Sequence, residues 1–223
     1  MTKAIFYKEW IKLRGVVISM AAIFILLGIY LVMSTESKLR IAGSAHLWAM
    51  VSQKDINMLA LLKYFPIVAG LVIGMFQFIP EMNKRSLKLT LHLPIAERKT
   101  IVTMMLFCAS ILLAVFVATC LIIFPLLSSS FPWVVLNAWL AAASPWFLAG
   151  LSTYFLCVWV CIEPAWKRRI ANGVIAVTLI SSFIVSAGCF GYIYMTPTLI
   201  AITLICALFP FHSVIRFKEG VQD

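Results

Sequence analysis

Long apolar runs separated by short polar segments make up most of the chain. Six runs are almost free of charge, and each has the roughly 18 or more residues that an α-helix needs to cross a bilayer. Their apolar and polar side chains do not alternate, as they would in membrane-spanning strands. We therefore expect an all-α integral membrane protein whose six transmembrane helices cover residues 16–33, 59–80, 101–127, 134–162, 170–195 and 197–215.

Composition supports a membrane protein and excludes two other classes. Of the 223 residues, 63% are apolar and 12% are charged, against about 45–50% and about 25% in soluble domains. A chain of this length cannot bury that excess inside a soluble globule. A soluble enzyme and a disordered protein are both excluded. Because no Pro-, Ser- or Gly-rich linker interrupts the pattern, we expect one transmembrane domain over residues 1–223.

The basic residues predict the topology. All but four of the 18 Lys and Arg residues fall in the N-terminal segment, the loop after the second run, the loop after the fourth run and the C-terminal tail. The exceptions are Lys38, Arg40, Lys54 and Lys63. Basic residues concentrate on the cytoplasmic side of membrane proteins, so we expect both termini there, in a multi-pass protein of a cell membrane, most simply a bacterial inner membrane. Topology explains the net charge of +10 better than nucleic-acid binding, and we expect no nucleic-acid partner.

The six cysteines all lie inside apolar runs, where thiols behave as small apolar groups. We expect free thiols rather than a disulfide framework. Cys157 and Cys161 are one helical turn apart, but no suitable His or carboxylate joins them, so no metal site is expected.

Residues 1–15 form the first informative segment. Phe6, Trp10 and Leu13 recur at helical spacing, while Lys8, Glu9 and Lys12 occupy the other side, and the segment ends at Arg14. An amphipathic pattern with a basic face and a Trp favours a helix lying in the membrane interface, in contact with lipid. The alternative is a plain basic flank that orients the first span.

The loop over residues 81–100 is the second such segment, because it is not simply polar. Leu87, Leu89, Leu91 and Leu93 alternate with polar residues, and Pro94, which favours the first turn of a helix, precedes Ile95. Apolar side chains in a cytoplasmic loop need a surface to cover them. That surface is either another protein, which would make this a docking segment, or the helix ends of the same chain.

Together, these two segments resemble the permease subunit of ABC-2 type exporters. In that family a basic helix precedes the first span, and a loop after the second span carries Glu, Ser/Thr-Leu, Leu and Pro-Ile/Val-x-Arg at similar spacing. The matching residues here are Glu81, Ser86, Leu87, Leu91, Pro94, Ile95 and Arg98. Larger members of that family carry a sizeable external insertion before the last span, whereas residues 194–197 leave room here only for a tight turn. The segment 34–58 is then the only sizeable external loop that we expect.

The resemblance implies a mechanism. Residues 87–99 would be a coupling helix seated on a separate ATP-binding cassette subunit, Glu81 a cytoplasmic anchor, and residues 5–14 a connecting helix. The translocation path would form with a second permease, either another copy of this chain or a related one. The chain lacks the Gly-x(4)-Gly-Lys-Ser/Thr phosphate loop, so it would be a non-catalytic subunit, with ATP and Mg²⁺ bound by the partner.

Polar residues inside a membrane are candidates for function, and few are present. Gln77 and Asn137 are candidates to face a pore. Glu163 is expected to end the fourth span in a local ion pair with Lys167, Arg168 or Arg169. The otherwise apolar and aromatic spans favour a lipid-like or amphipathic cargo over a small ion.

Three other classes compete with the exporter subunit. An intramembrane enzyme is disfavoured, because the spans hold no Ser–His pair, paired Asp or His-Glu zinc motif. A substrate-capturing module of a vitamin importer would favour small residues at four-residue spacing in the first span. The small residues there, Ala21, Ala22 and Gly28, do not form that pattern. A membrane assembly protein without an ATPase partner also fits the pattern.

Overall fold

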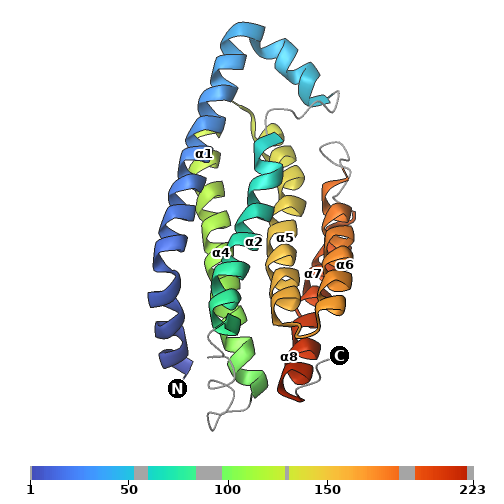
Figure 1. Cartoon of the computed structure of the whole chain (residues 1–223). Helices are drawn as coiled ribbons and strands as arrows, with labels where there is room; N and C mark the ends of the chain where they lie inside the picture. Colours follow the sequence, from blue (N-terminus) through green and yellow to red (C-terminus); the bar gives the residue numbers. More distant parts are fainter. Residues whose placement is uncertain (1, 53–59, 84–96, 129–130, 186–193, 220–223) are drawn as a thin grey trace.

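The computed structural model describes residues 2–52, 60–83, 97–128, 131–185 and 194–219, and every regular element in these ranges is an α-helix. The helices are α1 (Thr2–Ser52), α2 (Ala60–Asn83), α4 (Glu97–Ser128), α5 (Trp133–Ile162), α6 (Trp166–Ile184), α7 (Thr196–Cys206) and α8 (Phe209–Glu219). They form an elongated bundle, in which α1 begins at the same end as α8 finishes (Figure 1). We call this end the terminal end, and the opposite one the far end.

Five segments of the described chain are long and apolar enough to cross a membrane: Lys3–Ser37, Leu62–Asn83, Lys99–Ser128, Trp139–Ile162 and Thr196–Arg216. The prediction of an all-helical fold is therefore confirmed for the described residues, and the five segments agree in length and composition with a multi-pass membrane protein. The fifth expected span, 170–195, lies partly outside the described residues. Its residues 170–184 belong to α6, which has 19 residues and carries Lys167, Arg168 and Arg169 near its start. The count of six spans remains a prediction.

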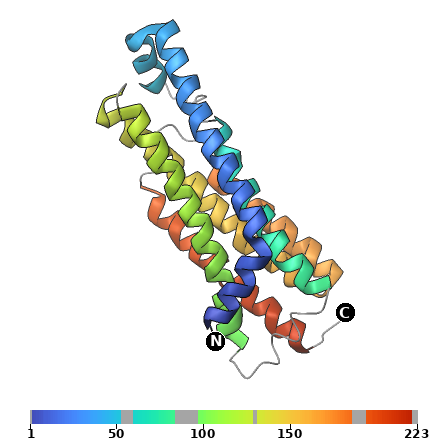
Figure 2. The ribbon, with the colours of Figure 1, turned by 90° about the vertical axis from the view of Figure 1, so that its left-hand side faces the viewer.

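The first helix is longer than expected. Residues 1–15 were predicted to form a separate interfacial helix, and 34–58 an external loop, but α1 is continuous for 51 residues, from Thr2 to Ser52. A proline is the usual residue that stops a helix, and none occurs in this range. At the far end α1 bends, and its last turns fold over the bundle (Figures 1 and 2).

The last expected span is divided in two. Residues 197–215 were predicted to form one helix, but α7 ends at Cys206 and α8 begins at Phe209. Pro210 explains the break, because it has no N–H to donate to the carbonyl of Cys206. Ala207 and Leu208 form the turn, and their N–H groups donate to the carbonyls of Thr203 (3.2 Å) and Ile205 (2.9 Å).

Helix α5 is the centre of the bundle, since it packs against α2, α4, α6, α7 and α8. Its closest neighbour is α2, where Gly70 and Gly74 form a Gly-x(3)-Gly pattern that permits close helix approach in membranes. A Cβ added at Gly70 would lie 2.1 Å from the carbonyl oxygen of Gly150 in α5, and one at Gly74 would lie 2.9 Å from the sulfur of Cys157. The α2–α5 contact therefore requires glycine at position 70.

We predict that Gly70→Ala lowers the free energy of unfolding by about 1–3 kcal/mol, the usual cost of overpacking, because the backbones must separate. Gly173→Ala is the matched control, since a Cβ there has no neighbour within 4 Å and alanine is the better helix former. Thermal unfolding of both variants in mild detergent measures the difference. Equal midpoints for the two variants would contradict the close α2–α5 packing.

Candidate functional site: a buried polar junction at the terminal end

The face of α1 that packs against the bundle carries a charged residue. Ile5, Leu13, Val17 and Met20 are buried at helical spacing, and Glu9 lies in the same row with a relative exposure of 0%. The expectation that Glu9 shares the outer, polar side with Lys8 is wrong. Phe6 and Trp10, which were grouped with Leu13, are instead 40% and 43% exposed. The first turns of α1 therefore pack into the bundle with the side of the helix that carries Glu9.

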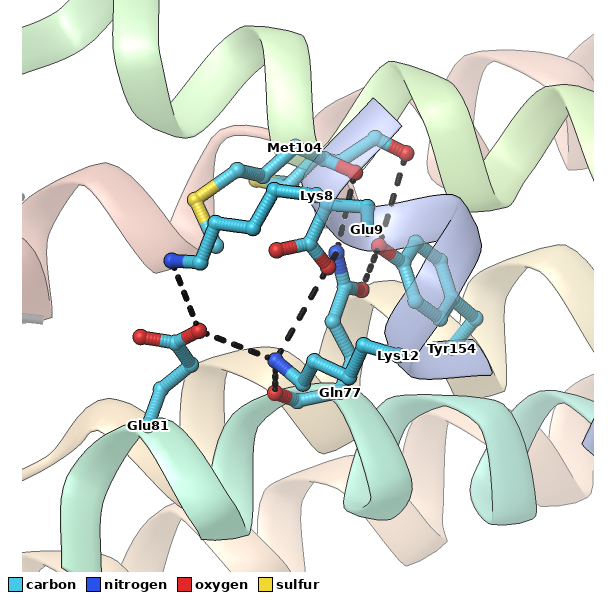
Figure 3. A network of polar contacts seen from close by, with 8 residues as sticks. Lys8, Glu9, Lys12, Gln77, Glu81, Met104 and Tyr154 are labelled. Carbon is cyan, nitrogen blue, oxygen red and sulfur yellow. Dashed lines mark hydrogen bonds and ion pairs between the residues drawn. The ribbon is translucent and has the colours of Figure 1, made fainter. Parts of the chain in front are cut away.

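Gln77 of α2 is the centre of a hydrogen-bond network that joins four helices (Figure 3). Its side-chain nitrogen donates to Glu9 Oε2 of α1 (3.1 Å) and to the carbonyl oxygen of Met104 in α4 (3.0 Å). Its side-chain oxygen accepts the hydroxyl proton of Tyr154 in α5 (2.7 Å). Both acceptors face the same terminal atom, so that atom must be the NH₂ group, and the amide orientation follows from the network.

Burial makes this network energetically important. Gln77, Tyr154 and Glu9 are each 0% exposed, and a buried polar group without a partner costs several kcal/mol in an apolar medium. Gln77 uses both amide protons and its side-chain oxygen, which leaves it fully paired. Glu9 is only partly paired, since its Oε1 atom has no hydrogen-bond partner in the part of the chain that the structure describes.

Two lysines of α1 pair with Glu81 at the end of α2. Lys8 Nζ lies 3.0 Å and Lys12 Nζ 3.1 Å from Glu81 Oε1. Lys12 Nζ also donates to the backbone oxygen of Gln77 and lies 3.8 Å from Glu9 Oε2. Two cations therefore face two carboxylates, which balances the formal charge of a cluster whose acidic members are almost completely buried. We call these residues, with Gln77 and Tyr154, the polar junction.

The polar junction fixes the last turn of α2, which precedes the loop that was predicted to dock a partner. Glu81 is two residues from the end of α2 at Asn83, and the loop follows directly. Because Lys8 and Lys12 of α1 pair with Glu81, the last turn of α2 is joined directly to the first turns of α1. The arrangement is suited to transmitting movement between these two segments.

The predicted site residues fall into three groups. Glu9, Leu13 and Glu81 are buried at the terminal end, with Phe6, Trp10 and Arg14 on the exposed side of α1. Gln77 faces the interior of the four-helix junction rather than a pore within this chain, and Asn137 is exposed on α5. The docking residues Leu87, Leu89, Leu91, Leu93, Pro94 and Ile95 lie outside the described residues, and Arg98 is described by its backbone alone, in the first turn of α4.

A third buried carboxylate, Glu163, holds the last helix. Glu163, which is 1% exposed, follows the end of α5, and its Oε1 lies 3.0 Å from a guanidinium nitrogen of Arg216 in α8. Ser213 of α8 donates to its other oxygen. The expected ion pair with the neighbouring basic residues is therefore wrong in its partner, since Arg169 instead donates to the Glu163 backbone oxygen at 2.8 Å. Glu163 ends α5 as predicted.

Sequence reasoning missed two features of this end. Tyr154 was treated as part of an apolar run, although a tyrosine hydroxyl buried in a membrane requires a polar partner. The Gly70-x(3)-Gly74 pattern was the available signal for the close contact that brings α2 and α5, and hence Gln77 and Tyr154, together.

Comparisons with models of known protein families, with curated proteins and with solved structures found no match. The resemblance to exporter permeases therefore rests on the residues quoted above.

We predict that Tyr154→Phe lowers the free energy of unfolding by about 1–2 kcal/mol, since it removes one hydrogen bond and leaves a buried amide oxygen without a donor. Tyr194→Phe makes the same chemical change at a side chain that is 91% exposed, and it should leave stability unchanged. Unfolding in mixed detergent–SDS micelles compares the two. Equal stabilities of the two variants would show that the Tyr154 hydroxyl contributes nothing to the junction.

Proposed function

We propose that the chain is the membrane-spanning permease subunit of an ATP-binding cassette exporter. In this proposal the loop after α2 docks onto a separate ATP-binding subunit, and two permeases form the path for a lipid-like or amphipathic cargo. The chain itself would bind no nucleotide. Six spans, with α6 as the fifth, and two cytoplasmic termini complete the proposed topology.

The observation that carries the proposal is the pairing of Lys8 and Lys12 with Glu81 at distances of 3.0 and 3.1 Å. An exporter needs a rigid link between the loop that senses the ATPase and the helices that open the path. The polar junction supplies such a link between α1, α2, α4 and α5. One of its members is Glu81, the residue that the family resemblance makes the cytoplasmic anchor.

Two further features support the proposed topology. The start of α1, the α5–α6 connection and α8 all lie at the terminal end (Figure 1), which gathers the basic residues of these segments on one side. In addition, α6 runs back along α5 toward the far end, and α7 and α8 return. With its 19 residues, α6 has nearly the length that a bilayer core requires.

We predict that affinity purification of the tagged chain from its native host in mild detergent recovers a stoichiometric ATPase that contains a phosphate-loop motif. Leu91→Asp should abolish its recovery and the associated ATP hydrolysis, because it places a charge in the apolar docking segment. Ser37→Asp adds the same charge to an exposed position at the far end of α1 and should retain the ATPase. Mass spectrometry and an ATPase assay read out both variants.

Recovery of the chain alone, or only with other membrane proteins, would contradict the exporter proposal and favour a substrate-capturing or assembly protein. Retention of the ATPase by Leu91→Asp would place its docking surface elsewhere on the chain.

A further inference from the structure

The basic residues at the start of α1 divide between two faces of the helix. Lys8 and Lys12 face α2 and pair with Glu81. Lys3 and Arg14 are exposed, and neither forms an ion pair with an acidic side chain that the structure describes. Positions 3, 7, 10, 14 and 21 recur at helical spacing, so Lys3 and Arg14 share a face with Tyr7, Trp10 and Ala21. Among the described side chains, that face therefore carries positive charge without an acidic partner.

An aromatic pocket lies on this face at the terminal end. It is lined by Lys3, Phe6, Tyr7 and Trp10 of α1 and by Phe107 of α4. Phe6 and Phe107 meet edge to face, with ring centroids 5.1 Å apart, while Tyr7 remains 67% exposed. Tyrosine and tryptophan rings beside a lysine are typical of the level of lipid headgroups.

Further along the same two helices, the pocket is followed by an apolar groove. Its lining residues are Val17, Ala21, Phe24 and Ile25 of α1 and Ile111, Ala114, Val115, Ala118 and Thr119 of α4. Three of these are alanines, which leave the seam between the helices open. Figure 2 shows α1 and α4 side by side on this face. We call the pocket and groove together the α1/α4 groove.

We propose that the α1/α4 groove binds one anionic phospholipid of the surrounding bilayer. Arg14 projects back toward the start of α1, as helical side chains do, and pairs with the phosphate, for which a guanidinium is a strong donor. Lys3 adds attraction for an anionic headgroup, Tyr7 and Trp10 lie at the headgroup level, and one acyl chain runs along the alanine-lined groove.

Charge complementarity selects this occupant. A second copy of the chain would place either its own Lys3 and Arg14 or another surface of the same basic protein against this positive face. With a net charge of +10 on each copy, that contact would be repulsive. A zwitterionic lipid would fill the groove but gain less from the two cations. Basic residues near a membrane surface each strengthen binding to anionic lipids by about fivefold, which is the scale on which the test operates.

The test measures lipid retention by native mass spectrometry of the purified chain titrated with phosphatidylglycerol or phosphatidylcholine. The parent chain should retain phosphatidylglycerol preferentially. Lys3→Gln with Arg14→Gln should reduce that retention by about 20- to 30-fold and leave phosphatidylcholine unchanged. Lys167→Gln removes an exposed cation at the same end of the bundle, away from the groove, and should retain the preference.

A second pair of variants tests the acyl-chain part. Ala114→Leu with Ala118→Leu fills the groove at two exposed positions and should weaken retention of both lipids. Ala22→Leu adds a similar volume on another exposed face of α1 and should weaken neither. Unchanged thermal midpoints verify that all variants fold.

The proposal is overturned if the parent shows no preference for phosphatidylglycerol, or if Lys167→Gln loses as much of the preference as the double variant. It is also overturned if filling the groove leaves retention unchanged, or if the chain dimerises through this face and excludes added lipid.

Discussion

The structure depends on one constraint: polar groups buried in a lipid environment must find their partners within the protein. Gln77 meets it for four helices at once, because one amide offers two donors and an acceptor to α1, α4 and α5. The carboxyl groups of Glu9 and Glu81 impose the same requirement, and Lys8 and Lys12 are their cationic partners. The first turns of α1 are therefore held in the bundle by polar pairing as well as by apolar packing.

The close α2–α5 contact is what makes this junction geometrically possible. Glycines at positions 70, 74 and 150 bring the two backbones together, which places the Tyr154 hydroxyl within reach of Gln77. Glu163 and Arg216 play a comparable role for α8, so each buried acid at the terminal end ties a chain terminus to the bundle. On the opposite side of α1, Lys3 and Arg14 remain available to the membrane. The first helix thus carries a structural face and a lipid-facing one.

The sequence predicts the helices of this structure better than the faces that they bury or the side chains that they pair. Apolar runs predicted that the chain forms helices of membrane-spanning length, because such runs reflect the thickness of a bilayer, but they predicted neither the full length of α1 nor the division between α7 and α8. Local periodicity failed for residues 1–15, since Phe6, Trp10 and Leu13 form a plausible apolar face and nothing nearby indicates a partner for Glu9. That partner, Gln77, is 68 residues away, and pairing over such a separation is set by tertiary packing. The break at Pro210 and the glycine pattern of α2 were visible in the sequence. By contrast, the pairing of Glu163 with Arg216 rather than with Arg169 depends on where α8 packs.

The central claim is that α1 and the base of the loop after α2 are joined through the polar junction. A double-mutant cycle of Lys12→Met and Glu81→Gln, read as the free energy of unfolding in detergent–SDS mixtures, tests it most directly. The account predicts that the two substitutions are non-additive by about 1 kcal/mol or more, because either one alone breaks the same buried pair. Additivity within about 0.3–0.5 kcal/mol would mean that the two residues act independently, and would contradict a coupled junction.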